Sequence, residues 1–132
     1  MAGPLFPSGP WVGFYTYAST PSRRYLMDLQ LRFRNRKIEG DGADDLDHFV
    51  IDGTYDEKSL ECHWQKIYPT IPPVTYQGYR EGKGIWGRWT LPTVKGGFHI
   101  WPLSEGPPPD LRRLVEEVPV ELVKRPPLIR TR

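Results

Sequence analysis

Between Trp11 and Leu103 the chain divides into eight short segments in which apolar and polar residues alternate. A period of two is typical of a β-strand with one buried and one exposed face. The connections are rich in Pro, Ser, Asn, Gly and Asp, the residues that favour tight turns. The predicted strands span residues 11–17, 24–33, 37–42, 48–56, 59–68, 74–80, 84–91 and 97–103.

The alternation is clearest in residues 24–33, where one face is apolar and the other carries charged and polar side chains. The apolar face consists of Tyr25, Met27, Leu29, Leu31 and Phe33, and the polar face of Asp28, Gln30, Arg32 and Arg34. The same division predicts further inward residues, namely Phe49, Ile51, Tyr55, Leu60, Cys62, Trp64, Phe98 and Ile100.

The stretch VTYQGYREGKGIWGRWTL, residues 74–91, predicts a hairpin with Gly82 and Lys83 at the turn, because a type II′ turn favours glycine first. This register pairs Tyr76 with Trp89 and Gly78 with Gly87 on the inner face. On the outer face it pairs Tyr79 with Trp86, Gln77 with Arg88 and Thr75 with Thr90. The two opposed glycines leave a space that a neighbouring ring or a ligand must fill.

Eight sequential strands with short connections predict an all-β fold, an eight-stranded antiparallel up-and-down β-barrel over residues 9–103. The length of 132 residues suits one such domain. A two-sheet sandwich has the same pattern and is the main alternative. We favour the barrel because no long crossover connection is visible.

Residues 104–132 differ from the rest in composition. LSEGPPPD predicts a stiff linker. Asp110 then provides a cap for a short helix that ends before Pro119, with its apolar residues at Leu111, Leu114, Val115 and Val118. The final VKRPPLIRTR is a basic tail, or alternatively a proline-rich docking peptide for a protein partner.

The eight-strand meander, the Gly9-Pro10-Trp11 opening and the late YQGYREGKGIWGRW together resemble the calycin superfamily of lipocalins, fatty-acid-binding proteins and avidins. The resemblance implies a barrel closed at one end by Trp11, with a basic residue from a late strand packed across the indole. Arg88 is the matching position, although the alternation places it on the outer face. The residues with which avidins hold biotin find no match, so biotin binding is not implied.

The spaced glycines and aromatics also resemble a standalone barrel domain of unknown role, and a similar barrel recruits substrates in some F-box ubiquitin-ligase subunits. The sequence contains no F-box region, so the resemblance implies no ligase function.

Composition narrows the classes of function. The net charge is +2, and the basic cluster RFRNRK is followed by the acidic run DGADDLD, which argues against nucleic-acid binding. A single cysteine, Cys62, excludes an intrachain disulfide. Neither a signal sequence nor an apolar run of membrane-spanning length is present, so we expect a cytoplasmic protein without membrane partners.

Little in the sequence predicts catalysis. The acidic run does not fit a calcium-binding loop, and a solvated turn is the simpler interpretation. His48, His63 and His99 would suggest an enzyme only if the fold brought them together with acids, and Cys62 reads as an inert core thiol. We therefore predict no catalytic residues, no metal and no cofactor.

The inward aromatics with polar tips favour a binding module that takes a small molecule or a peptide end into one barrel mouth. The predicted ligand-binding residues are Tyr15, Tyr25, Tyr55, Trp64, Lys66, Tyr76, Gly78, Gly87 and Trp89. Lys66 and Arg80 lie in the inward phase, where each would suit an anionic group or reach solvent from the rim.

The alternative is an assembly domain that acts through its outer surface. Tyr79, Trp86 and Trp101 predict an apolar patch there, which either associates with another protein, including a second copy, or is covered by the apolar residues of 104–132.

Overall fold

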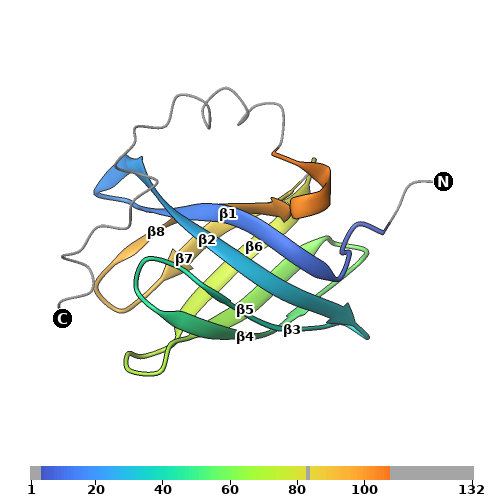
Figure 1. Cartoon of the computed structure of the whole chain (residues 1–132), viewed down its shortest axis with the longest axis horizontal. Helices are drawn as coiled ribbons and strands as arrows, with labels where there is room; N and C mark the ends of the chain where they lie inside the picture. The colour runs from blue at the N-terminus through green and yellow to red at the C-terminus, as the bar shows by residue number, and fades with distance from the viewer. Residues whose placement is uncertain (1–3, 83, 108–132) are drawn as a thin grey trace.

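The computed structural model describes residues 4–82 and 84–107, and these form a closed barrel of eight antiparallel strands in chain order (Figure 1). The strands are β1 (Gly9–Tyr17), β2 (Thr20–Arg34), β3 (Lys37–Ala43), β4 (His48–Tyr55), β5 (Glu61–Ile67), β6 (Val74–Glu81), β7 (Gly84–Thr90) and β8 (Lys95–Pro102). A 3₁₀ turn, η1 (Leu103–Glu105), follows. The predicted barrel is confirmed and the sandwich alternative is wrong. The predicted helix near Asp110 lies outside the described residues.

Closure depends on β8 pairing back onto β1, from Trp11 opposite Pro102 to Tyr17 opposite Gly96. Because of this pairing, none of the eight described strands has an unpaired edge, and this protects a barrel from edge-to-edge association. Among the described residues, no helix has the length and apolar character needed to cross a membrane.

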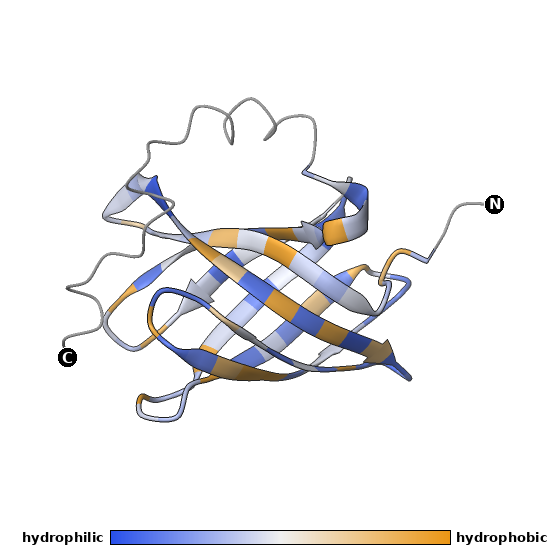
Figure 2. Cartoon of the chain, in the orientation of Figure 1, coloured by the Kyte–Doolittle hydropathy of each residue, from blue (hydrophilic) through white to orange (hydrophobic). Residues whose placement is uncertain are grey.

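The predicted alternation is confirmed along β2, which changes repeatedly between hydrophobic and hydrophilic residues (Figure 2). Tyr25, Met27, Leu29 and Leu31 are buried inside the barrel, and the residues between them are exposed. Each buried side chain of this size contributes about 1.5–3 kcal/mol of hydrophobic stabilisation. The inner faces of all eight strands form one continuous core.

One strand begins later than predicted. We expected a strand over 59–68, but Asp56–Leu60 form a turn and β5 starts at Glu61. The Asp56 carboxylate accepts hydrogen bonds from the backbone N–H groups of Lys58 (2.7 Å) and Ser59 (3.1 Å). Leu60 has a φ of 67°, which lies outside the β region of strand residues, and its side chain packs at the border of the core.

The β6–β7 hairpin has the predicted register, with Tyr76 opposite Trp89 and Gly78 opposite Gly87. Gly82 has a φ of 62° at the turn, as a glycine-first turn requires. A Cβ on Gly78 would lie 2.9 Å from the Phe98 ring, so this ring fills the space that the glycines leave. This contact fits the simpler of the two interpretations, a packed ring at this position.

Trp11 closes one end of the barrel. Its indole Nε1 donates to the Pro7 carbonyl (2.9 Å), and its ring packs on Phe33. Arg80 lies across the indole with its guanidinium carbon 5.9 Å from the ring, and it donates to the carbonyls of Leu5 and Gly82. The residue that packs on Trp11 is therefore Arg80 and not Arg88. Arg88 is exposed because it has the opposite phase on its strand.

Candidate functional site

The opposite end of the barrel is open and contains a pocket of about 310 Å³. Its walls come from the end of β1, from β5, β6 and β7, and from the loops that join β3 to β4, β5 to β6 and β7 to β8. The lining residues are Tyr15, Tyr17, Leu46, Lys66, Tyr68, Ile71, Val74, Tyr76, Trp89, Leu91 and Val94. Most of this surface is apolar, and Lys66 is the one charged residue of the lining.

Trp89 forms one wall, and a glycine makes room for it. The indole Nε1 donates to the carbonyl of Thr16 (2.9 Å), and its ring meets the Tyr17 ring edge-on at 5.3 Å. A Cβ on Gly96 would lie 2.8 Å from that indole nitrogen and 1.7 Å from the Thr16 oxygen. Only glycine at position 96 therefore permits this hydrogen bond between β7 and β1.

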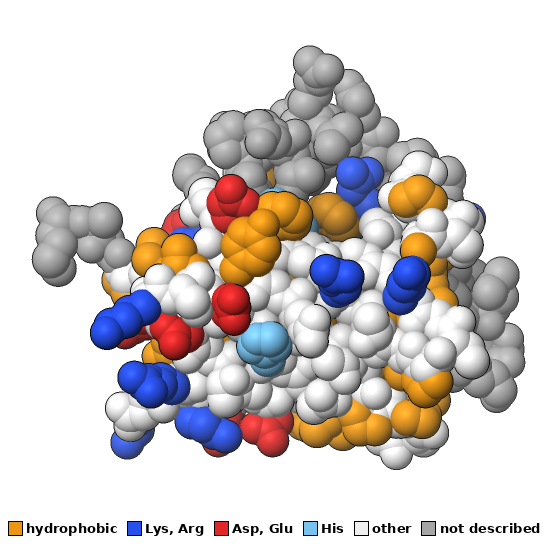
Figure 3. All heavy atoms as spheres, turned by 180° about the vertical axis from the view of Figure 1, so that it is seen from behind, with side chains coloured by type: hydrophobic (Ala, Val, Ile, Leu, Met, Phe, Trp, Pro, Cys, Tyr) orange, Lys and Arg blue, Asp and Glu red, His pale blue; other side chains and the backbone are white. Residues whose placement is uncertain are grey.

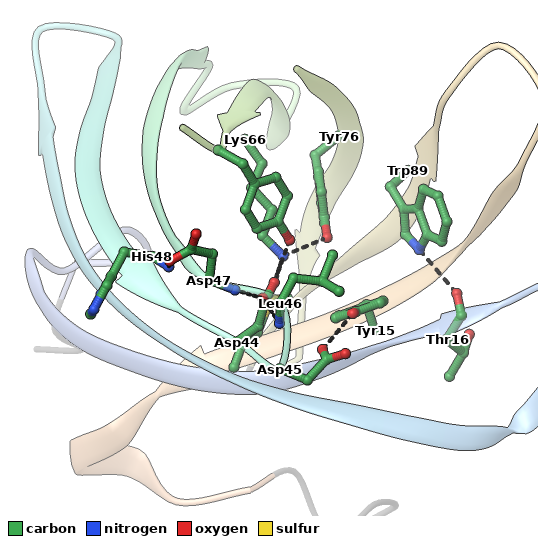
Figure 4. Close-up of polar contacts among 12 residues, drawn as sticks. Tyr15, Thr16, Asp44, Asp45, Leu46, Asp47, His48, Lys66, Tyr76 and Trp89 are labelled. Carbon is green, nitrogen blue, oxygen red and sulfur yellow. Dashed lines mark hydrogen bonds and ion pairs between the residues drawn. The ribbon is translucent and has the colours of Figure 1, made fainter. Parts of the chain in front are cut away.

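A buried ion pair forms the floor (Figure 4). Lys66 is 2 % exposed, and its Nζ lies 2.5 Å from the Asp44 carboxylate, which also accepts a hydrogen bond from the Tyr68 hydroxyl. The same Nζ donates to the Tyr76 hydroxyl (3.3 Å) and lies 4.5 Å from the centre of the Phe49 ring. Burial lowers the pKa of Lys66, and the charge of Asp44 opposes that effect. The expectation that Lys66 reaches solvent from the rim is wrong.

Asp44 also holds the loop between β3 and β4 over the mouth. Its second carboxylate oxygen accepts hydrogen bonds from the backbone N–H groups of Leu46 (2.8 Å) and Asp47 (3.3 Å), and Leu46 lines the pocket. The prediction that the acidic run is a solvated turn is wrong for Asp44 and Asp45, which are both buried. A lysine in the inward phase requires a buried counter-charge, and this requirement is the signal that could have indicated an acid.

Asp45 is 1 % exposed and has one unsatisfied oxygen. Its Oδ1 accepts a hydrogen bond from the Tyr15 hydroxyl (2.5 Å), while its Oδ2 has no partner among the described residues. Burial raises the pKa of the Asp45 carboxyl, the hydrogen bond from Tyr15 lowers it, and the charge of Asp44 raises it. Burial and the two nearby carboxylates raise the pKa of the Tyr15 phenol, so Tyr15 remains a donor.

This raised pKa predicts a pH dependence of stability. The folded state holds the Asp45 proton more tightly than the unfolded chain, so the free energy of unfolding falls as the pH rises above the ordinary value of 3.8. The fall ends at the higher pKa of the folded state. We expect Asp45→Asn to be more stable than the wild type above this window and similar to it below. Urea unfolding from acid to neutral pH measures the difference.

Asp41→Asn is the matched control, because Asp41 belongs to the same acidic run and is exposed. It should follow the wild-type pH curve. If the Asp45→Asn protein also follows that curve, Asp45 does not carry the predicted proton linkage.

Four of the predicted ligand-binding residues line the pocket: Tyr15, Lys66, Tyr76 and Trp89. Tyr25 and Trp64 lie one layer behind, where Tyr25 stacks on Tyr15 at 5.2 Å and Trp64 stacks on Tyr76 at 5.4 Å. The others lie away from the pocket, since Tyr55 packs on Phe6 at the closed end, Gly78 lies against the Phe98 ring and Gly87 lies against the backbone of Gln77 and Gly78.

Seven of the lining residues were not indicated by the sequence pattern, and they lie on loops or strand ends. These are Tyr17, Leu46, Tyr68, Ile71, Val74, Leu91 and Val94. Side chains alternate between two faces only within strands, so this pattern cannot place apolar residues of the loops.

The predicted outer surface divides into two groups. Tyr79 and Trp86 are 41 % and 39 % exposed, and their ring centres lie 5.1 Å apart. Trp101 is buried and packs against Phe14 and His99 instead. Exposed hydrophobic side chains are visible on the back of the molecule, interspersed with charged ones (Figure 3). A role for this surface in association remains a prediction.

The three histidines do not lie together, because His48 is on β4, His63 on β5 and His99 on β8, which pairs with neither. Within residues 4–82 and 84–107, no group of three or more His, Cys, Asp and Glu side chains is placed to hold a metal ion. Cys62 is buried, and burial raises the pKa of its thiol to about 12, so the nucleophilic thiolate is disfavoured.

Comparisons with known proteins do not indicate a function for this chain. No protein-family model matches the sequence, and comparisons with curated proteins and with solved structures give no significant match. The topology is consistent with a calycin-like barrel.

Proposed function

We propose that this protein is a non-enzymatic binding module that takes a small, ring-bearing molecule into the open mouth of a calycin-like barrel. The observation that carries the proposal is the pocket of about 310 Å³ at the end opposite Trp11. Binding sites for small molecules have volumes of this order, with mostly apolar walls and a few buried polar groups.

The contrast between the two barrel ends supports this function. Phe6, Phe33 and Tyr55 pack together beside Trp11 at one end. At the other end the aromatic rings surround a space instead of filling it. Aromatic walls provide large apolar contact areas and edge or face contacts to a ring-bearing ligand. The peptide end that the sequence analysis also allowed would have to enter the same mouth.

Rigid packing behind the lining is a second support. Tyr15 is held by Asp45 and Tyr25, Trp89 by the Thr16 carbonyl, and Tyr76 by Trp64. Side chains held in this way lose little conformational entropy when a ligand binds, which favours affinity.

Binding of N-phenyl-1-naphthylamine, a neutral probe with a naphthalene and a phenyl ring that brightens in apolar sites, tests the proposal. We expect saturable binding to the wild type, and at least about tenfold weaker binding to Val94→Trp, whose new side chain would occupy the mouth. Val50→Trp is the matched control, because Val50 is an exposed residue of β4 outside the pocket, and it should bind as the wild type does.

Two results would contradict the proposal. One is the absence of saturable fluorescence enhancement with the wild type. The other is equal affinity of the wild type and Val94→Trp, once thermal unfolding has established that both variants are folded.

A further inference from the structure

The charges beneath the pocket allow an inference about which ligands it accepts, and this inference rests on the proposed function. Three ionisable groups of opposite sign are buried together beneath the pocket, namely Asp44, Asp45 and Lys66, and of these only Lys66 lines it. Arg80, the other buried cation of the described residues, lies on Trp11 at the closed end. Beneath the pocket, two carboxyl groups therefore share one ammonium.

Lys66 is not available to an anionic ligand. Its ammonium is paired with Asp44 at 2.5 Å and lies 4.7 Å from the Tyr15 ring centre and 4.5 Å from that of Phe49. A ligand carboxylate could replace Asp44 only if Asp44 lost the hydrogen bonds that it accepts from the Tyr68 hydroxyl and from the backbone N–H groups of Leu46 and Asp47. The buried Asp44 carboxylate would then lack hydrogen-bond partners, which is strongly unfavourable in free energy.

Two hydroxyl protons of the cluster are also committed. Tyr15 donates to Asp45 and Tyr68 donates to Asp44. The unsatisfied atom of the cluster is an acceptor, Oδ2 of Asp45. Asp45 does not line the pocket, so it acts on a ligand through its charge: a positively charged ligand end complements the floor, and one that adds a further negative charge does not.

The walls favour the same chemistry. Tyr17, Tyr76 and Trp89 present aromatic rings to the pocket, and cations are attracted to the faces of such rings. The structure itself contains an example, because the Lys66 ammonium lies within 5.4 Å of the Tyr76 ring centre as well as near Tyr15 and Phe49.

We propose that the pocket takes an apolar ring-bearing molecule whose polar end is a protonated amine, and that it excludes carboxylates of the same shape. This differs from the sequence-based expectation that Lys66 suits an anionic group. The sequence predicts the inward lysine, but the two acids that reverse the balance of charge come from a loop.

Three probes with the same indole ring and two-carbon arm test the proposal by calorimetry at neutral pH. Tryptamine carries an ammonium, tryptophol a neutral hydroxyl and indole-3-propionate a carboxylate. We expect tryptamine to bind most tightly, with indole-3-propionate at least about tenfold weaker than tryptophol. In Asp45→Asn, tryptamine should lose about tenfold in affinity while tryptophol is little changed.

Asp41→Asn removes an exposed charge from the same acidic run and should leave all three affinities as in the wild type. If indole-3-propionate binds as tightly as tryptamine, the inference about charge is overturned and the binding function stands. If N-phenyl-1-naphthylamine binds but none of the three indoles displaces it, the inference is also overturned. If neither the naphthylamine nor any indole binds, the proposed function itself fails.

Discussion

Replacing Asp44 by asparagine should destabilise the protein by about 3–5 kcal/mol, because it removes the carboxylate that pairs directly with the buried ammonium of Lys66. Asparagine retains one acceptor oxygen for the N–H groups of Leu46 and Asp47. Its amide nitrogen, however, would face two other donors, the ammonium of Lys66 and the hydroxyl of Tyr68. Urea unfolding followed by tryptophan fluorescence measures the loss.

Two further variants decide whether the ion pair is the cause. Asp52→Asn removes an exposed carboxylate paired with Lys37 at 3.9 Å and should change stability by less than about 1 kcal/mol. The double variant Asp44→Asn with Lys66→Met removes both charges and should be more stable than Asp44→Asn alone. If the double variant is no more stable, the unpaired ammonium is not the source of the loss.

Truncating Trp11 should have an effect of similar size. The side chain is 1 % exposed and fills the closed end between Phe33 and Arg80, so Trp11→Ala removes a large apolar contact and leaves a cavity. We expect a loss of about 3–5 kcal/mol, with part of it due to the guanidinium of Arg80 losing the ring beneath it. Thermal and urea unfolding measure this loss.

Trp86→Ala is the matched control, because Trp86 is a strand tryptophan of the same barrel that lies on the outer face and is 39 % exposed. Its hydrogen bond to Glu81 and its contact with Tyr79 are both exposed, so the cost should stay near or below about 1 kcal/mol. Equal losses in the two variants would show that Trp11 is not a plug of the barrel end.

The β6–β7 hairpin shows why much of the architecture could be predicted. The side chains of a strand point alternately to the two faces, so the inward positions of Tyr76 and Trp89 follow from the pattern alone. The turn glycine then sets the register, and the pairing of Gly78 with Gly87 is observed as expected. Arg88 illustrates the same rule, since the alternation placed it outside, whereas the resemblance suggested that it packs on Trp11.

The candidate site was predicted only in part, because some of its residues lie on strands and others lie on loops. Tyr15, Lys66, Tyr76 and Trp89 lie on strands, and their phase indicated that they point inward. Leu46, Ile71, Leu91 and Val94 lie on three loops, where no period applies and where each loop folds over the mouth only in the closed barrel. The pocket is thus a property of the barrel end and not of any one segment.

The sequence by itself determined the strand order, the inner and outer faces and the β6–β7 register, because these depend on local alternation and turn chemistry. Only the tertiary structure decided which polar groups are buried together. Asp44 and Lys66 are separated by 22 residues, and their meeting depends on barrel closure and on the path of the β3–β4 loop. The same closure brings Asp45 to Tyr15, 30 residues away, and so decides the charge of the floor. Electrostatic interactions depend on distance in space and on burial, which local sequence patterns do not specify.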